Sequence, residues 1–213
     1  SAIGWVRRHH HPRAAETPDK PKNLGWCRSC SSGTPTMVGN PVNIGTGNKY
    51  QIERDYIGRE LEFSRHYNSQ LSLSANNSIG YRSPLGLNWR STYDRFIRFT
   101  DSLRYATAYV YRPDGKTLYF RLRDGAFHAD DDVPDRLVRL TDSGGNIVGW
   151  EYTVGDSEDK ETYGADGKLI SIKSRSGVVQ TLSYDASGKL QTVTSSFGHT
   201  LTFGYDTSGK LTS

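Results

Sequence analysis

The C-terminal part of the chain repeats one heptapeptide at a fixed interval. It reads Tyr-Gly-Ala-Asp-Gly-Lys-Leu at residues 163–169, Tyr-Asp-Ala-Ser-Gly-Lys-Leu at 184–190 and Tyr-Asp-Thr-Ser-Gly-Lys-Leu at 205–211, so each copy begins 21 residues after the last. A constant period of this length is typical of repeat architectures, in which each unit is one supersecondary element that packs on its neighbours. The repeat therefore constrains the fold more than any other feature of the sequence.

Each repeat is predicted to be one β-hairpin. Apolar and polar residues alternate before each tyrosine, as in Leu182-Ser-Tyr184, and this period of two is typical of a strand with one buried face. The following Asp and Gly favour a tight turn, because Asp bonds its own downstream backbone and Gly tolerates positive φ. Ser176-Gly177 and Phe197-Gly198 are expected to return the chain. A lone hairpin cannot bury its apolar face, so the units should pair edge to edge in one antiparallel sheet.

Two groups of repeat residues follow from this interpretation. The predicted turn residues are Asp166, Gly167, Asp185, Gly188, Asp206 and Gly209. The predicted repeat core consists of Tyr163, Leu169, Leu182, Tyr184, Leu190, Leu201, Phe203 and Tyr205.

Composition divides the chain into three predicted parts. Residues 1–37 form a Pro-rich basic linker, residues 38–108 a β domain rich in Gly, Asn, Thr and aromatic residues, and residues 109–213 the repeat sheet, which begins with a degenerate repeat at 109–118. Residues 89–99 alternate like a strand, and residues 129–135 and 155–161 are expected to be acidic loops. No segment predicts a long helix, so the predicted fold class is all-β.

The repeated Tyr-Asp-x-x-Gly-Lys-Leu resembles the YD repeat of bacterial RHS proteins. Upstream, three ordered motifs at residues 38–50, 61–69 and 86–94 are similar to the uncharacterised domain that heads many RHS proteins. The resemblance implies a curved sheet of hairpin repeats that forms the opening part of a hollow shell around a C-terminal toxin. It also implies export in interbacterial competition by type VI secretion or a related system, and hence a secreted or cell-surface location.

The same resemblance supplies the expected partners. They are the remaining RHS repeats and the C-terminal toxin domain of the same protein, together with secretion-spike proteins. Because the chain starts at Ser1 and stops within a repeat at Ser213, we expect it to be an N-terminal portion of such a shell.

The charge distribution argues against a nucleic-acid partner. The formal net charge is +4, but residues 1–30 hold six Lys or Arg against two Asp or Glu, which leaves 21 residues of each sign in residues 31–213. A nucleic-acid-binding domain would carry a basic stripe on its folded part. The sequence also contains no apolar run of the length that a membrane span requires.

Cys27 and Cys30 form the most conspicuous chemical motif, Trp-Cys-x-x-Cys at residues 26–30. A redox site would need a preceding strand and a following helix, which this Pro-rich segment does not predict. A zinc site would need further ligands, such as His9–His11. A local disulfide in an exported protein and two inert thiols are the remaining interpretations. We predict no metal site and no cofactor.

The candidates for acid–base catalysis are the carboxylates of Glu60 and Glu62, and of Asp94 with an acid on a facing strand. Such pairs can hydrolyse glycosides, but nothing in their sequence surroundings distinguishes these acids from solvated strand residues. The sequence therefore predicts a protein that is not an enzyme. Its predicted function is structural encapsulation of a toxin; the alternative is a secreted or surface YD-repeat protein that binds glycans or a protein.

Overall fold

The computed structural model describes residues 37–38, 42–43, 47–71, 83–99 and 107–213. Within these ranges the chain forms sixteen β-strands and no helix, and every pair of neighbouring strands is antiparallel. The strands belong to three sheets, none of which closes into a barrel. The predicted all-β class is therefore confirmed.

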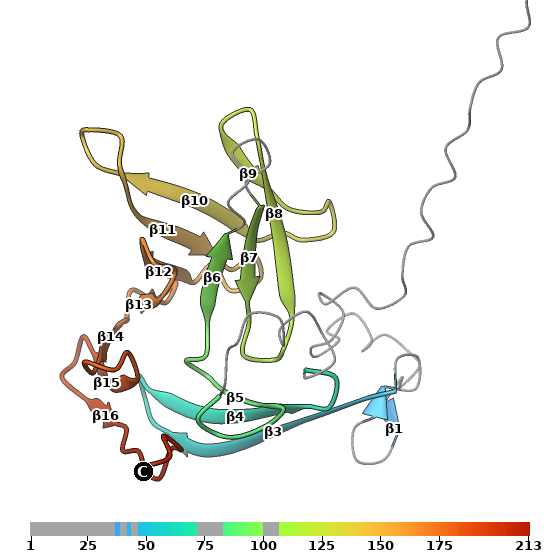
Figure 1. The fold of residues 1–213 in the computed structure, drawn as a ribbon, viewed down its shortest axis with the longest axis vertical. Helices are drawn as coiled ribbons and strands as arrows, with labels where there is room; N and C mark the ends of the chain where they lie inside the picture. The colour runs from blue at the N-terminus through green and yellow to red at the C-terminus, as the bar shows by residue number, and fades with distance from the viewer. Residues whose placement is uncertain (1–36, 39–41, 44–46, 72–82, 100–106) are drawn as a thin grey trace, which may run out of the picture.

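The first sheet lies at the bottom of Figure 1 and contains the described N-terminal strands in sequence order. The hairpin of its two longest strands contains a bulge between Arg54 and Tyr56. The strands are β1 (Met37–Val38), β2 (Val42–Asn43), β3 (Asn48–Ile57), β4 (Glu62–Asn68) and β5 (Trp89–Ser91).

The second sheet stands upright above the first in Figure 1 and holds four strands, again in sequence order. Its central hairpin is the degenerate repeat, and Gly115 in that turn has a φ of 93°. The strands are β6 (Phe96–Phe99), β7 (Thr107–Tyr111), β8 (Thr117–Arg123) and β9 (Ala126–His128).

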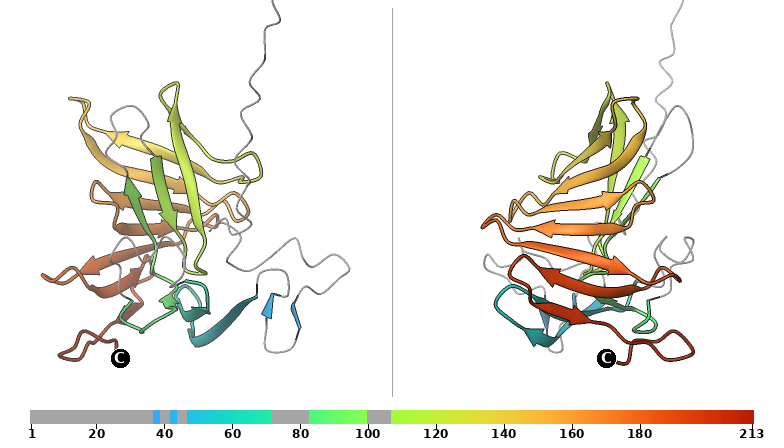
Figure 2. Two further views of the ribbon diagram at one scale, coloured as in Figure 1. Left: turned by 45° about the vertical axis from the view of Figure 1, so that its right-hand side comes forward. Right: turned by 90° about the vertical axis from the view of Figure 1, so that its left-hand side faces the viewer.

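The third sheet is a seven-stranded meander that contains the repeats. Its strands follow one another from β10 at the top to β16 at the bottom, and the sheet is twisted (Figure 2). Edge-to-edge growth by hairpins is thus confirmed. The strands are β10 (Arg136–Thr141), β11 (Ile147–Thr153), β12 (Lys160–Gly164), β13 (Leu169–Lys173), β14 (Val179–Tyr184), β15 (Leu190–Ser195) and β16 (Thr200–Thr202).

One hydrophobic core joins the three sheets. Aromatic contacts attach the second sheet to the top of the meander: the rings of Phe99 and Trp150 are stacked 4.1 Å apart, and Phe120 meets Tyr152 edge-on at 6.1 Å. Farther down, the ring of Phe203 lies 5.5 Å from that of Phe63 on β4. The N-terminal sheets therefore cover one face of the meander along much of its length.

The opposite face of the meander carries hydroxyl side chains. Cross-strand pairing places Thr162, Ser171, Thr181, Thr194 and Thr200 in one row over five successive strands. All five are exposed or half-buried. β-branched Thr suits a pleated surface that meets water, so this face needs no covering layer.

Two local predictions were wrong. Residues 89–99 form two strands instead of one, because Asp94 accepts a hydrogen bond from the Ser91 backbone N–H at 2.7 Å and turns the chain between β5 and β6. The predicted loop at residues 155–161 is two residues too long, because residues 155–159 form the loop whereas Lys160 begins β12 and Glu161 is fully buried.

The predicted domain boundaries remain predictions. The boundary between residues 108 and 109 falls inside β7, and residues 1–36 of the predicted linker lie outside the described residues.

Candidate functional site

The repeat turns are built around Asp side chains that bond the backbone ahead of them. Oδ1 of Asp185 accepts the N–H groups of Ser187 and Lys189, both at 2.9 Å. Asp166 accepts the N–H of Lys168 at 3.1 Å, and Asp206 that of Lys210 at 2.8 Å. Hydrogen bonds to Ser187 and to the Lys189 backbone lower the pKa of Asp185, since they favour its charged form.

The glycines in these turns have left-handed backbones. Gly167, Gly188 and Gly209 have φ values of 79°, 81° and 82°. This conformation costs a residue with a Cβ about 1–2 kcal/mol, so the recurring glycine completes the turn.

Successive repeats are linked by tyrosine and lysine side chains. The hydroxyl of Tyr184 donates to the Leu169 carbonyl at 2.7 Å, and that of Tyr205 donates to the Leu190 carbonyl at 2.8 Å. In the other direction, Lys168 reaches over the ring of Tyr184, with 5.7 Å between its Nζ and the ring centroid. Each repeat thus offers a carbonyl and an ammonium group to the next one.

Lys189 makes the equivalent contact with the third repeat. Its Nζ lies 5.1 Å from the ring centroid of Tyr205 and 3.0 Å from the point where a Cβ on Gly209 would stand. Nζ of Lys168 has the same 3.0 Å relation to Gly188. The glycines therefore also provide space for the lysine of the preceding repeat.

The first repeat docks on the second sheet instead of on another repeat. The N–H of Ile97 on β6 donates to the Gly167 carbonyl at 2.9 Å, and Phe96 forms a β-bridge with Lys168. A Cβ built on Gly167 would stand 2.0 Å from the Ile97 carbonyl oxygen. The first turn thus fits its docking site only as glycine.

A buried carboxylate stabilises this junction. Glu161 binds Arg95, which follows β5, and Arg112, which follows β7, with 2.6 and 2.9 Å between the Arg112 nitrogens and its carboxylate oxygens. The hydroxyl of Tyr163 donates to Glu161 at 2.5 Å. Burial raises the pKa of Glu161, but Arg112 and Arg95 outweigh it and lower the pKa to about 2. The charged cluster therefore connects all three sheets.

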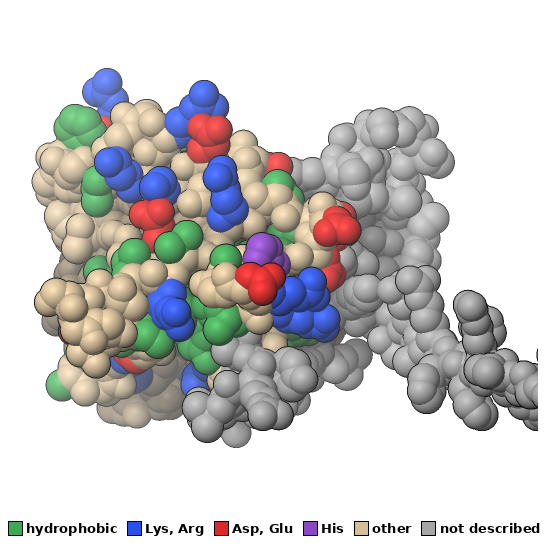
Figure 3. Space-filling view, turned by 90° about the horizontal axis from the view of Figure 1, so that it is seen from above, with side chains coloured by type: hydrophobic (Ala, Val, Ile, Leu, Met, Phe, Trp, Pro, Cys, Tyr) green, Lys and Arg blue, Asp and Glu red, His purple; other side chains and the backbone are tan. Residues whose placement is uncertain are grey.

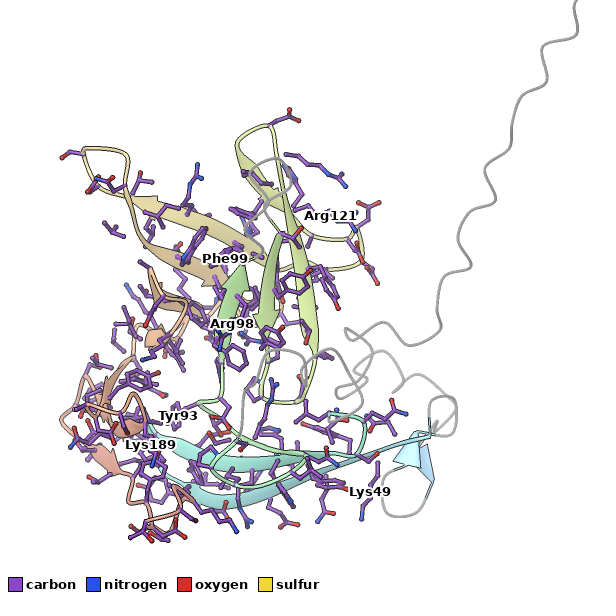
Figure 4. All side chains as sticks on the ribbon, in the orientation of Figure 1. Lys49, Tyr93, Arg98, Phe99, Arg121 and Lys189 are labelled. Atoms are coloured by element: carbon purple, nitrogen blue, oxygen red, sulfur yellow. The ribbon has the colours of Figure 1, made fainter. Side chains whose placement is uncertain are left out.

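A groove of about 460 Å³ runs along the repeat turns beside this cluster. We call it the lysine–tyrosine groove. Figure 4 labels three of its lining residues: Lys189 and Tyr93 lie beside the repeats in this view, and Arg98 lies above them. Its lining comprises Pro84, Tyr93, Asp94, Arg95, Phe96, Ile97, Arg98, Asp166, Gly167, Lys168, Leu169, Tyr184, Gly188, Lys189, Leu190, Tyr205 and Gly209.

The predicted repeat-core residues have different degrees of burial. Tyr163, Leu169 and Leu182 are buried in the common core. Tyr184, Leu190, Leu201 and Phe203 are half-buried and pack against that core, whereas Tyr205 is half-buried in the groove wall.

Two of the three candidate catalytic acids make structural contacts, and the third is exposed. Glu60 binds His199 at 2.7 Å, Asp94 accepts the Ser91 N–H, and Glu62 is exposed on β4. Cys27, Cys30 and His9–His11 lie outside the described residues. The described ranges hold no group of three or more His, Cys, Asp or Glu arranged to bind a metal.

Sequence reasoning missed Arg95, Arg112 and Glu161. The one usable signal is that Glu161 and Tyr163 are two residues apart, which places them on one face of a strand. The two arginines lie 66 and 49 residues from Glu161 in the chain, and no local pattern reveals such a contact.

This geometry defines a class of protein built from interlocking β-hairpin repeats on an N-terminal β domain. Family models agree: residues 163–200 and 184–213 match the RHS repeat, and residues 39–120 match a domain of unknown function, DUF6531, found at the start of RHS proteins. The chain is an RHS/YD-repeat protein with this N-terminal domain. A comparison with curated proteins found no match.

The family places limits on function and location. RHS repeats and the N-terminal domain are in general non-catalytic, and RHS repeat proteins are typically secreted or at the cell surface. Among the described residues there is no helix of the length and apolar character that a membrane crossing requires.

Proposed function

We propose that this chain is the opening part of a shell that encloses a toxin located C-terminal to it, for export in competition between bacteria. The main support is the set of contacts that Tyr184 and Tyr205 make with the preceding repeat, which we call the repeat interlock. Tyr184 and Tyr205 each bind the preceding repeat through the same two contacts, so the sheet extends by a constant geometric step. A constant step with a persistent twist gives a curved wall.

The first repeat gives this wall a fixed starting point. Glu161 binds Arg95 between β5 and β6, the Gly167 turn binds Ile97 on β6, and β12 is buried there at Glu161 and Tyr163. A wall that is anchored at one end and extended by identical steps can enclose a volume without a cofactor.

The charge on one face of the molecule is consistent with a container. Lys and Arg side chains are interspersed with Asp and Glu over the face shown in Figure 3. Mixed charge without a single-sign field limits adhesion to nucleic acid and to other polyanions.

The glycan-binding alternative has less support. A platform for sugars would present several aromatic rings on one surface. In the described ranges the exposed rings are those of Tyr56 on β3 and Phe197 in the turn after β15, which belong to different sheets.

Proteolysis of the complete protein tests encapsulation. We expect trypsin to leave the polypeptide C-terminal to the repeats intact in the native protein and to digest it at once when it is expressed alone. Gly167→Ala should open the wall at its anchor and expose the cargo, whereas Gly177→Ala, whose site has no atoms within 4 Å, serves as the matched control.

Equal digestion rates for the enclosed and the separate polypeptide would refute encapsulation. Expression of residues 1–213 inside bacteria should leave viability unchanged. Killing that disappears when one acidic residue is changed would instead identify an enzyme in this segment.

A further inference from the structure

The lysine–tyrosine groove carries more positive than negative side chains. Arg95, Arg98, Lys168 and Lys189 line it, against Asp94 and Asp166. Asp166 forms an exposed ion pair with Lys168 at 3.8 Å, which an incoming carboxylate would have to displace. Behind the lining, Glu161 is shared between Arg95 and Arg112, so one carboxylate faces two guanidinium groups there. The excess of positive charge favours a ligand with negative charge.

The positive groups along the repeats are spaced regularly. Lys168 and Lys189 occupy equivalent positions before β13 and β15, which are separated by one strand in the sheet order. Two strand spacings amount to about 9.6 Å. A ligand that engages both lysines must therefore present its negative groups on one side at about this interval.

Aromatic rings line the same groove. Tyr184 and Tyr205 are half-buried in the wall, and Phe96 stacks on Tyr111 with 4.5 Å between the ring centroids. Grooves lined with aromatic rings are the usual docking sites for proline-rich segments.

We propose that the groove binds an acidic, proline-rich polypeptide segment in the polyproline II conformation. This helix rises about 3.1 Å per residue with three residues per turn, so carboxylates at every third position lie on one side about 9.3 Å apart. An extended β-strand repeats on one side at about 6.7 Å instead, which does not match the lysines. Polyproline II is also preformed, so little entropy is lost on docking.

The carboxylates of such a segment bind Lys168 and Lys189, and its proline rings lie on the aromatic wall. Arg98 is exposed, lines the same groove and adds a third positive group. The chain's own Pro-rich residues 1–30 do not fit, because they contain six Lys or Arg and two acids. The partner is thus a different polypeptide segment.

The probe is a fluorescent peptide of repeated Glu-Pro-Pro units. The control peptide has the same composition, but its glutamates alternate with prolines in one continuous segment and the remaining prolines follow, so its carboxylates do not recur at every third position. By fluorescence anisotropy at low salt, we expect the chain to bind the Glu-Pro-Pro peptide at least about tenfold more tightly, and added salt should weaken the binding. Equal binding of both peptides, or none to the Glu-Pro-Pro peptide, would overturn the proposal.

Charge variants locate the site. Lys168→Gln with Lys189→Gln should weaken binding about tenfold or more, whereas Lys160→Gln with Lys173→Gln removes the same charge from exposed strand positions and should change it less than about twofold. Arg98→Gln, which leaves both lysine–tyrosine contacts in place, should also weaken binding, and it tests the groove even where the lysine pair misfolds. If Arg98→Gln and the lysine pair both bind like the parent chain, the groove is not the site.

Discussion

The docking of the first repeat turn can be tested with one methyl group. Gly167→Ala places a Cβ 2.0 Å from the Ile97 carbonyl oxygen and 3.0 Å from its carbonyl carbon. Both atoms belong to the backbone of β6, so no side chain can rotate away. The turn and the strand must separate by more than 1 Å to reach ordinary contact, because real Cβ atoms essentially never approach a heavy atom closer than 3.0 Å.

Three effects add to the cost of Gly167→Ala. Left-handed backbone costs alanine about 1–2 kcal/mol, overpacking about 1–3 kcal/mol, and loss of the hydrogen bond between Ile97 N–H and the Gly167 carbonyl about 1 kcal/mol. The expected loss of unfolding free energy is about 3–6 kcal/mol. Gly177→Ala, with a φ of 92° and no atoms within 4 Å, should lose only the backbone term of about 1–2 kcal/mol.

Urea unfolding followed by tryptophan fluorescence, to which the buried Trp150 contributes, measures both variants. Amide hydrogen exchange provides an independent check, because the Ile97 N–H should lose its protection in Gly167→Ala and keep it in Gly177→Ala. Equal stability losses in the two variants, with Ile97 protected in both, would refute the docking argument.

Three further perturbations address the repeats. Because the pKa of Glu161 is lowered to about 2, its charge stabilises the fold above about pH 5, and this contribution disappears as the pH falls toward 2. Glu161→Gln should therefore lower the free energy of unfolding by about 3 kcal/mol at neutral pH. On acidification, the urea midpoint of this variant should converge on that of the parent chain. Tyr184→Phe should lower the free energy of unfolding by about 1 kcal/mol, because the Leu169 carbonyl loses its hydrogen-bond donor. Tyr56→Phe is the control, since the Tyr56 side chain is 46% exposed, and it should cost much less. Equal urea midpoints for the two variants would contradict the interlock. Gly188→Val should destabilise the protein by about 1–3 kcal/mol and Ala186→Ser by almost nothing, which thermal unfolding can compare.

The repeat sheet could be predicted from sequence because its determinants are local. Asp185 and Gly188 specify their turn within a few residues, and the alternation around Leu182 specifies which face is buried. The same logic holds for the hairpin at residues 141–146, where Asp142 accepts the N–H groups of Gly144 and Asn146.

The junction between the N-terminal part and the repeats could not be predicted in this way. Arg90 is buried at 1% exposure and donates to the Arg112 carbonyl at 3.1 Å, although a basic residue in a strand ordinarily faces solvent. Glu161 is buried because two arginines from distant segments compensate its charge. Such polar interiors depend on tertiary partners, which the spacing of residues in one sequence does not encode.

The direction of the repeat contacts has a consequence for synthesis on the ribosome. Tyr184 and Tyr205 bind carbonyls that lie 15 residues earlier in the chain, and the Gly167 turn binds Ile97, which is earlier still. Each new hairpin therefore finds its docking surface already made when it emerges. At translation rates of about 5–20 residues per second, a repeat is added every one to four seconds or so, which is far slower than hairpin formation in microseconds. The wall can grow in step with translation, so its unpaired edge is exposed to other chains for only a few seconds at a time.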